Sequence, residues 1–307
     1  MEANARWVAT AAVAPVAWGT TYYVTRHYLP AGYPVWGAAL RALPAGCLLL
    51  VLARTRPRGA WWWRSAVLGL LNTSVFFVLV YIAAQRLATS TASMVMALTP
   101  LVMTVTAWAL VAQRPRAAHL AGGVTGLAGV VLMMWGRTGG TGTGGLIASV
   151  AAMLVSSVGF VLSQRWNSGA GVLATTAWQL SFGGVLLLAA AAVSEGAPPP
   201  MDTGALLAYG YLAVVATALA FLVWFAALRK LPAATVGLAG LLNPVTGVLL
   251  GTLLAAEGLT GRQLAGMALI VAGVLLGLPR AGAAPTPREP ARPGDPSGRE
   301  TAPAREG

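Results

Sequence analysis

Ionisable side chains are scarce in this sequence. Charged residues make up 9% of the 307 residues, whereas 57% are hydrophobic, and the mean hydropathy is +0.72. A soluble domain carries about 25% charged residues, so this composition excludes a soluble globular protein. The apolar residues form long blocks without amphipathic spacing, which is typical of membrane-spanning helices.

Side chains for catalysis and metal binding are also few. The chain has one cysteine, Cys47, in an apolar run, and two histidines, His27 and His119, at predicted helix ends. A single cysteine can form neither a disulfide framework nor a metal cluster. No motif for metal-assisted hydrolysis, nucleophilic hydrolysis or phosphoryl transfer occurs. We therefore predict no catalytic residue, no cofactor and no metal; a membrane-embedded enzyme or scaffold is the rival class.

The excess of basic residues has a different origin from that of a nucleic-acid-binding protein. The net charge is +12, but the Lys and Arg residues lie in short loops between apolar blocks and in the C-terminal tail. The tail lacks the interleaved aromatics of a nucleic-acid-binding surface. We expect no nucleic-acid partner, and we expect the lipid bilayer to surround the chain.

Ten apolar blocks approach the roughly 20 residues that a spanning helix needs. With the N-terminus inside, ten Lys or Arg residues fall in inside loops and four in outside loops, which predicts an N-in and C-in orientation. The last residues, 280–307, are rich in Pro, Ala, Arg, Gly and Glu, which predicts a disordered cytoplasmic tail. The blocks lie near 7–25, 33–53, 63–84, 89–111, 117–135, 144–164, 172–193, 205–228, 232–254 and 261–278.

The second half of the chain repeats the first. At an offset of 144 positions, Arg86 aligns with Lys230 and Pro100 with Pro244, and about a quarter of roughly 55 ungapped pairs are identical. Five crossings in each half make the repeats inverted, an architecture that many secondary transporters use. We predict an all-α integral membrane protein of ten helices, divided into a first repeat at 1–136, a Gly/Thr linker at 137–145, a second repeat at 146–279 and the tail.

A few polar residues interrupt the apolar blocks. Arg41 lies about eight residues inside the second block, where an ionised group is expensive unless it faces a cavity or a partner. It either holds an anionic group of a substrate, or it is a structural arginine or one that snorkels to the nearby boundary. Its approximate repeat partner is the neutral Gln179, so the two half-sites are chemically unequal. Asn72 begins a further polar patch in the third block.

Two prolines occupy aligned positions, one in each half. Thr99-Pro100 aligns with Asn243-Pro244, and a proline frees backbone carbonyls one turn earlier in its helix. Breaks at matching positions indicate a midplane binding site, although a kink without ligand contact remains the alternative. Aromatic residues in neighbouring blocks complete the candidate substrate-binding set, and each could instead pack or lie at the membrane boundary. They are Trp18, Tyr22, Tyr81, Trp178 and Trp224.

These motifs resemble a known family. The Trp18-Gly19 helix opening, the Leu40-Arg41 pair, the run ASMVMALTP ending at Pro100 and the run TVGLAGLLNP ending at Pro244 are similar to EamA-type permeases. These permeases belong to the drug/metabolite transporter superfamily, and the resemblance covers about residues 6–279. One departure is Gln113 in the first repeat, where the second repeat has Glu257.

The resemblance implies a multi-pass carrier of the bacterial cytoplasmic membrane with a cavity between two five-helix EamA repeats. It implies export of small metabolites, such as amino acids or their derivatives, by alternating access. Broad-specificity drug efflux is the alternative function. No carboxylate lies within an apolar block, so proton coupling has no visible carrier. The terminal helix of each repeat is rich in glycine and could pack within the chain or form a homodimer face.

Overall fold

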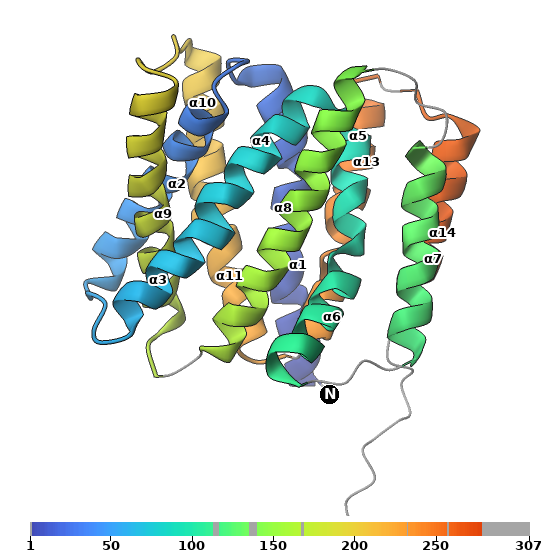
Figure 1. Cartoon of the computed structure of the whole chain (residues 1–307), viewed down its shortest axis with the longest axis horizontal. Helices are drawn as coiled ribbons and strands as arrows, with labels where there is room; N and C mark the ends of the chain where they lie inside the picture. Colours follow the sequence, from blue (N-terminus) through green and yellow to red (C-terminus); the bar gives the residue numbers. More distant parts are fainter. Residues whose placement is uncertain are drawn as a thin grey trace, which may run out of the picture.

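Helices account for all of the regular secondary structure in the part of the chain that the computed structural model describes (Figure 1). The described residues are 2–112, 117–134, 140–166, 169–231, 233–256 and 258–277. The predicted tail, Gln113 and Glu257 lie outside them. The predictions of an all-α fold and of a membrane protein are confirmed, because six described helices are long and apolar enough to cross a membrane.

The elements follow one another along the chain with short connections, and several join end to end into continuous rods. Elements η1 and η3 are π-helical turns, and η2 is a short 3-10 turn. The helices are α1 (Glu2–Tyr28), α2 (Pro34–Ala53), α3 (Trp61–Gly69), η1 (Leu70–Val75), α4 (Phe76–Arg86), α5 (Thr89–Val95), η2 (Met96–Leu98), α6 (Thr99–Val111), α7 (Ala117–Met134), α8 (Gly140–Arg165), α9 (Val172–Ser194), α10 (Thr203–Ala213), η3 (Val214–Leu219), α11 (Ala220–Leu228), α12 (Ala233–Ala239), α13 (Leu242–Leu253) and α14 (Gly261–Gly277).

The connection between the halves is shorter than the sequence predicts. Helix α8 begins at Gly140, so residues 140–145 of the predicted Gly/Thr linker are helical. Gly144 and Gly145 pack against Arg86 and Leu87 at the end of α4, which gives this glycine-rich turn a tertiary contact that composition does not show. The remaining linker residues, 137–139, lie outside the described part.

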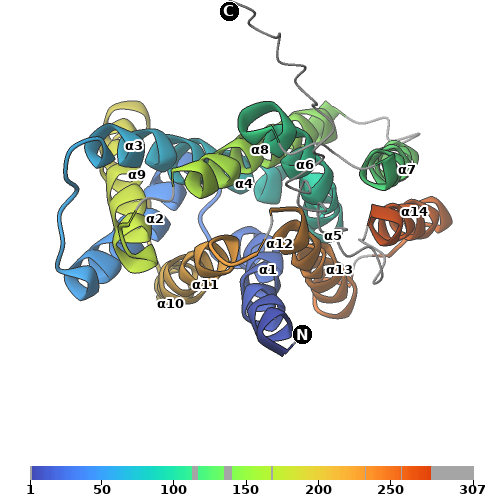
Figure 2. The same cartoon turned by 90° about the horizontal axis from the view of Figure 1, so that it is seen from below.

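Helices α7 and α14 pack against each other as a two-fold pair, set apart from the rest of the bundle (Figure 2). A Cβ added to Gly129 would lie 2.5 Å from the carbonyl oxygen of Gly266, and one added to Gly273 would lie 2.4 Å from that of Gly122. The 144-residue offset aligns Gly122 with Gly266 and Gly129 with Gly273. The two contacts are therefore related by exchange of the halves, as a two-fold axis requires.

Helices α2 and α9 form a second pair of the same kind. A Cβ on Gly46 would lie 2.7 Å from the backbone nitrogen of Ser181, and one on Gly184 would lie 2.7 Å from Cα of Leu43. An offset of 138 positions exchanges these two contacts. The same offset aligns Arg41 with Gln179. Small residues let both helix pairs approach closely, which is how helices associate where lipid removes the usual hydrophobic driving force.

The π-helical turns occupy equivalent places in the two halves. Element η1 covers residues 70–75 and η3 covers residues 214–219, which is the same 144-residue offset. A π-helical turn releases backbone groups from the normal hydrogen-bond ladder and often marks a functional site. The helix breaks ahead of the prolines are also equivalent, because η2 precedes Thr99 and the interruption between α12 and α13 precedes Asn243.

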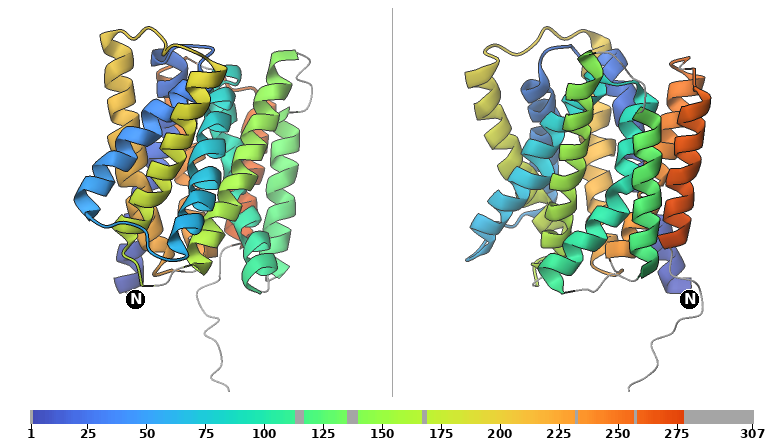
Figure 3. Two further views of the ribbon diagram at one scale, coloured as in Figure 1. Left: turned by 60° about the vertical axis from the view of Figure 1, so that its left-hand side comes forward. Right: turned by 45° about the vertical axis from the view of Figure 1, so that its right-hand side comes forward.

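The two ends of the bundle differ in charge. Helix α1 begins and α14 ends at the same end, which we call the basic end (Figure 3). At the opposite end, which we call the acidic end, Arg26, Arg86 and Arg262 lie in loops or helix termini together with Glu195 and Asp202. The described Lys and Arg residues of the basic end are Arg6, Arg54, Arg56, Arg58, Arg64, Arg165, Arg229 and Lys230.

Glu195 ties the halves together at the acidic end. Its carboxylate follows α9 and accepts hydrogen bonds of 2.8 Å from the backbone N–H groups of Val35 and Trp36, in the first turn of α2. These N–H groups have no partner inside their own helix. A carboxylate at this position also interacts favourably with the helix dipole, so Glu195 fixes the start of α2 relative to the end of α9.

Candidate functional site

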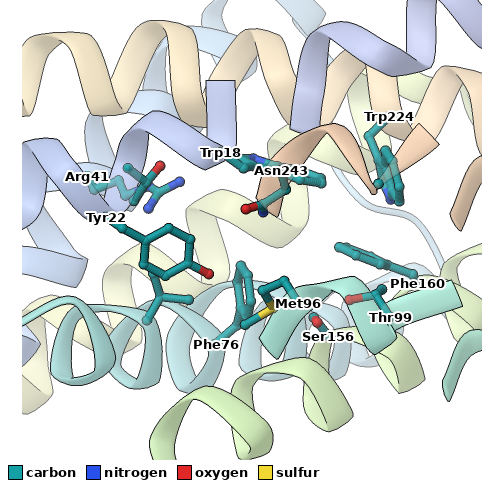
Figure 4. Close-up of a pocket in the computed structure, with 13 residues that line it drawn as sticks. Trp18, Tyr22, Arg41, Phe76, Met96, Thr99, Ser156, Phe160, Trp224 and Asn243 are labelled. Atoms are coloured by element: carbon teal, nitrogen blue, oxygen red, sulfur yellow. The ribbon is translucent and has the colours of Figure 1, made fainter. Parts of the chain in front are cut away.

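A pocket lies between the two halves of the bundle. Arg41 and Tyr22 lie towards one side of it, Asn243 lies near the centre, and Trp224 and Phe160 lie towards the other side (Figure 4). Its lining comes from both repeats: Trp18, Thr21, Tyr22, Arg41, Phe76, Val80, Met96, Thr99, Ser156, Phe160, Trp224, Gly240 and Asn243.

Equivalent residues of the two halves line the pocket. Thr99 aligns with Asn243 and Met96 with Gly240 at the 144-residue offset, and all four line the pocket. These residues belong to the helix breaks at η2 and between α12 and α13. Because both breaks face one cavity, the two prolines place irregular backbone where it lines a pocket rather than where it would meet lipid.

Arg41 carries the formal positive charge of the pocket. Its Nε donates to Oγ1 of Thr217 at 2.7 Å, and its Nη2 donates to the carbonyl oxygen of Ala216 at 3.0 Å. The guanidinium carbon lies 4.2 Å from the centre of the Phe77 ring, a cation–π contact. Arg41 is 5% exposed, and no carboxylate of the described residues pairs with it. An anionic solute would supply the missing counter-charge.

The π-helical turn η3 creates the anchor for this arginine. The carbonyl oxygen of Ala216 accepts from Arg41 and also from Nε1 of Trp18 at 3.0 Å. One released carbonyl therefore orients two pocket residues from α1 and α2. The side chain of Thr217 supplies the third bond. Hydrogen bonds to η3, rather than an ion pair, therefore hold the side chains of Trp18 and Arg41 in place.

Aromatic rings form the apolar wall. The Trp18 ring stacks on Phe160 with centroids 6.1 Å apart, and it meets the Trp224 ring edge-on at 5.0 Å. Phe221 lies behind this wall, 5.3 Å from Trp18 and fully buried. Such a wall suits contact with an apolar or planar group.

The second half-site is built on the same plan with neutral groups. Nδ2 of Asn72, in η1, donates to Oε1 of Gln179 at 3.0 Å and lies 3.3 Å from Oγ of Ser163. Asn72 aligns with Ala216, and Gln179 aligns with Arg41. In each half, the polar residue of α2 or α9 therefore binds the π-helical turn of the other half. Only the Arg41 half-site carries charge.

The structure places half of the twelve predicted site residues in the pocket: Trp18, Tyr22, Arg41, Thr99, Trp224 and Asn243. Asn72 and Gln179 instead bind each other. The Tyr81 ring packs on Gly37 and its hydroxyl donates to the carbonyl of Pro30, while Nε1 of Trp178 donates to the carbonyl of Thr55 at 2.9 Å. Pro100 and Pro244 are buried in the first turns of their helices without lining the pocket.

Sequence reasoning missed seven lining residues: Thr21, Phe76, Val80, Met96, Ser156, Phe160 and Gly240. Two signals were available for some of them. Thr21 precedes Tyr22 on the same helix, and Met96 and Gly240 lie one turn before the aligned proline motifs. Phe76, Val80, Ser156 and Phe160 sit in blocks that are apolar on every side, so no pattern distinguishes their inward face.

Two halves that repeat one helical pattern around a shared pocket are typical of secondary transporters. The chain belongs to the EamA-like transporter family, whose model matches residues 5–135 and again residues 143–278. The family resemblance predicted from the sequence motifs is thereby confirmed, and the two matches fall on the two halves.

Individual relatives agree with this family. Protein PecM of Dickeya dadantii (strain 3937) is 36% identical over 265 residues, which cover 86% of this chain and 89% of PecM. The uncharacterized inner membrane transporter YedA of Escherichia coli (strain K12) is 29% identical over 266 residues, covering 85% and 87% of the two chains. A solved crystal structure matches with a TM-score of 0.69 at 22% identity, over 89% of this chain and 97% of that one, which shows the shared fold.

Proposed function

We propose that this protein is a secondary transporter that exports small anionic or zwitterionic metabolites, such as amino acids or their derivatives, by alternating access. The single observation that carries the proposal is the buried Arg41 charge, which lacks a carboxylate partner and faces an aromatic pocket between the halves. A carboxylate or phosphate of the solute would bind the guanidinium. The aromatic wall would contact its apolar part, and Asn243 and Thr99 would offer hydrogen bonds.

The proposed topology has ten crossings with both ends in the cytoplasm of a bacterial cell, and the membrane is the cytoplasmic one. Its support is the charge asymmetry of the described residues: eight Lys or Arg residues lie at the basic end and three at the acidic end. Short loops that are rich in Lys and Arg stay inside. Two of the rods, α5–α6 and α12–α13, are interrupted by helix breaks. Each of them reaches a spanning length only when both of its parts are counted.

The sign of the pocket charge favours metabolite export over broad drug efflux. Many drugs are cations, and a cation beside Arg41 would meet a like charge in surroundings that screen it poorly. Export of an anion also gains from an inside-negative membrane potential, by about 2.3 kcal/mol per charge per 100 mV. The solute's own charge would then drive export, without a membrane-embedded carboxylate to carry a proton.

The test compares metabolites in the medium of cells that lack the gene and cells that overproduce wild-type protein, Arg41→Gln or Arg41→Lys. We expect acidic or zwitterionic solutes to accumulate with the wild type, to fall to the level of cells lacking the gene with Arg41→Gln, and to be partly restored with Arg41→Lys. The matched control is Arg58→Gln, which removes an exposed arginine at the basic end. Accumulation of cationic solutes, or full export by Arg41→Gln, would overturn the proposal.

A further inference from the structure

The connection between α2 and α3 gathers positive charge at one edge of the bundle. This segment, residues 54–64, lies at the opposite edge from the α7–α14 pair (Figures 1 and 2). Its four arginines are Arg54, Arg56, Arg58 and Arg64, of which the first three are exposed. Among the described residues, none of these four guanidinium groups forms a hydrogen bond or an ion pair with another side chain or carbonyl. The segment therefore carries charge that the rest of the described protein leaves uncompensated.

Arg64 is enclosed by indole rings that give it no hydrogen-bond acceptor. Its guanidinium carbon lies 5.6 Å from the ring centre of Trp63, 5.8 Å from that of Trp166 and 6.0 Å from that of Trp61. These cation–π contacts attract the charge but offer no oxygen atom. Nε of Arg64 is buried without a partner, whereas the terminal nitrogens are not enclosed. An oxyanion that reaches these terminal N–H groups would supply the missing acceptor, and a phosphate suits the planar fork of an arginine.

Contacts with α9 and with the end of α8 hold the segment in place. Nε1 of Trp178, on α9, donates to the carbonyl oxygen of Thr55 at 2.9 Å, and Thr55 lies between two of the arginines. The Trp61 ring lies 5.7 Å from the Trp178 ring, and the Trp63 ring meets the Trp166 ring edge-on at 5.1 Å. The arginines are therefore carried by a backbone that is fixed before a ligand arrives, which lowers the ordering cost of binding.

Exposed apolar side chains adjoin the arginines. Val51 and Leu52, in the last turn of α2, are 68% and 59% exposed, and Trp63 is 52% exposed. Positive charge beside an apolar surface suits an amphiphile that has an anionic headgroup and acyl chains. A soluble phosphate would gain nothing from the apolar side chains. The rule that Lys and Arg remain inside accounts for the sign of the charge in this short loop, but it does not account for a cation held among three indoles without an acceptor.

We propose that the segment 54–64 is a binding site for an anionic phospholipid of the leaflet at the basic end. The lipid phosphate binds Arg64 and the neighbouring exposed arginines, and the acyl chains lie along Val51 and Leu52. The site is independent of the proposed export function, because none of its residues lines the central pocket. A single change here, such as Arg58→Gln, therefore leaves the contacts with a transported solute unchanged.

The test counts bound phospholipid on delipidated, detergent-solubilised protein by native mass spectrometry. The protein is titrated with dioleoylphosphatidylglycerol, which is anionic, or with dioleoylphosphatidylcholine, which has the same acyl chains and no net charge. We expect the first lipid to bind the anionic lipid about ten-fold more tightly. Inorganic phosphate at the concentration of the lipid should not displace it, because inorganic phosphate has no acyl chain to contact the exposed apolar side chains.

Two double variants assign the binding to this segment. Arg54→Gln with Arg56→Gln should weaken binding of the anionic lipid by about five-fold for each arginine removed. The matched control is Arg6→Gln with Lys230→Gln, which removes two exposed cations at the same end but outside the segment, and it should bind as the wild type does. Arg64→Gln should also weaken binding; if this variant does not fold, the double variants decide.

Three outcomes would each overturn the proposal. Equal binding of the two lipids would show that the headgroup charge is not recognised. Equal losses in the two double variants would show that only the net charge of the basic end matters. Displacement of the lipid by inorganic phosphate would assign the segment to a soluble anion. The measurement requires no transport, so a failure of the proposed export would leave its result unchanged.

Discussion

The two-fold packing of α7 on α14 makes a quantitative prediction about two glycines. Gly129→Ala places a methyl group 2.5 Å from the carbonyl oxygen of Gly266, and Gly273→Ala places one 2.4 Å from that of Gly122. The obstructing atoms are backbone in both cases, so rotation of a side chain cannot relieve the clash. The helices must separate, and overpacking of this kind costs about 1–3 kcal/mol.

Symmetry sets the pattern as well as the size of the effect. Because the two contacts are equivalent, each single substitution should lower the unfolding free energy by a similar amount. The double variant should cost less than the sum, since the first substitution has already separated the helices. A loss of 2 kcal/mol changes the folding equilibrium about 30-fold.

The assay is loss of the monodisperse size-exclusion peak of detergent-solubilised protein after heating to a series of temperatures. The matched control is Gly210→Ala on α10, where an added Cβ meets nothing within 4 Å. This change should leave the melting temperature unchanged or raise it, because alanine is the better helix former. Unchanged melting for both Gly129→Ala and Gly273→Ala, or a loss in one only, would refute the two-fold packing.

Three further outcomes follow from the contacts described above. Glu195→Gln should lower the melting temperature in the same assay, because two charge-assisted bonds to the first turn of α2 weaken, at a cost of about 1–2 kcal/mol. The comparison at the same end is Asp202→Asn, since Asp202 caps α10 by accepting from the backbone N–H of Ala205. An unchanged melting temperature for Glu195→Gln would contradict the cap. Trp18→Phe keeps a ring in the wall but loses the bond to Ala216, so the KM for export should rise several-fold, whereas Trp62→Phe at an exposed ring should not change it. In proteoliposomes, an inside-negative potential set with potassium and valinomycin should speed export of a net-anionic solute, and a rate independent of potential would exclude charge-driven export.

The sequence predicted the membrane fold well because the relevant signals are long and additive. Apolar blocks of about 20 residues, and a repeat that relates the two halves of the chain, can be recognised in the sequence despite many local irregularities. The equivalent helix breaks ahead of Pro100 and Pro244 were visible because proline acts on the backbone directly. The α-helical start of α8 at Gly140 was not, because composition alone favours a flexible linker and the contacts with Arg86 and Leu87 are tertiary.

The candidate site was predicted less completely for a physical reason. Helices that are apolar on every side carry no periodic signal for the face that points inward, so Phe160 in the pocket and Trp178 outside it look alike in sequence. Arg41 was identifiable because a buried charge is costly wherever it points. The exchange of partners between the halves, with Gln179 bound to Asn72 and Arg41 bound to η3, required coordinates.

The central claim, a pocket reached in turn from the two faces of the membrane, is tested most directly by a single cysteine. Thr99→Cys in a Cys47→Ser background is labelled with a membrane-impermeant maleimide added to one face at a time. The account predicts labelling from both faces, with protection from each by the metabolite that wild-type cells export. Labelling from one face only, with no protection by that metabolite, would contradict it.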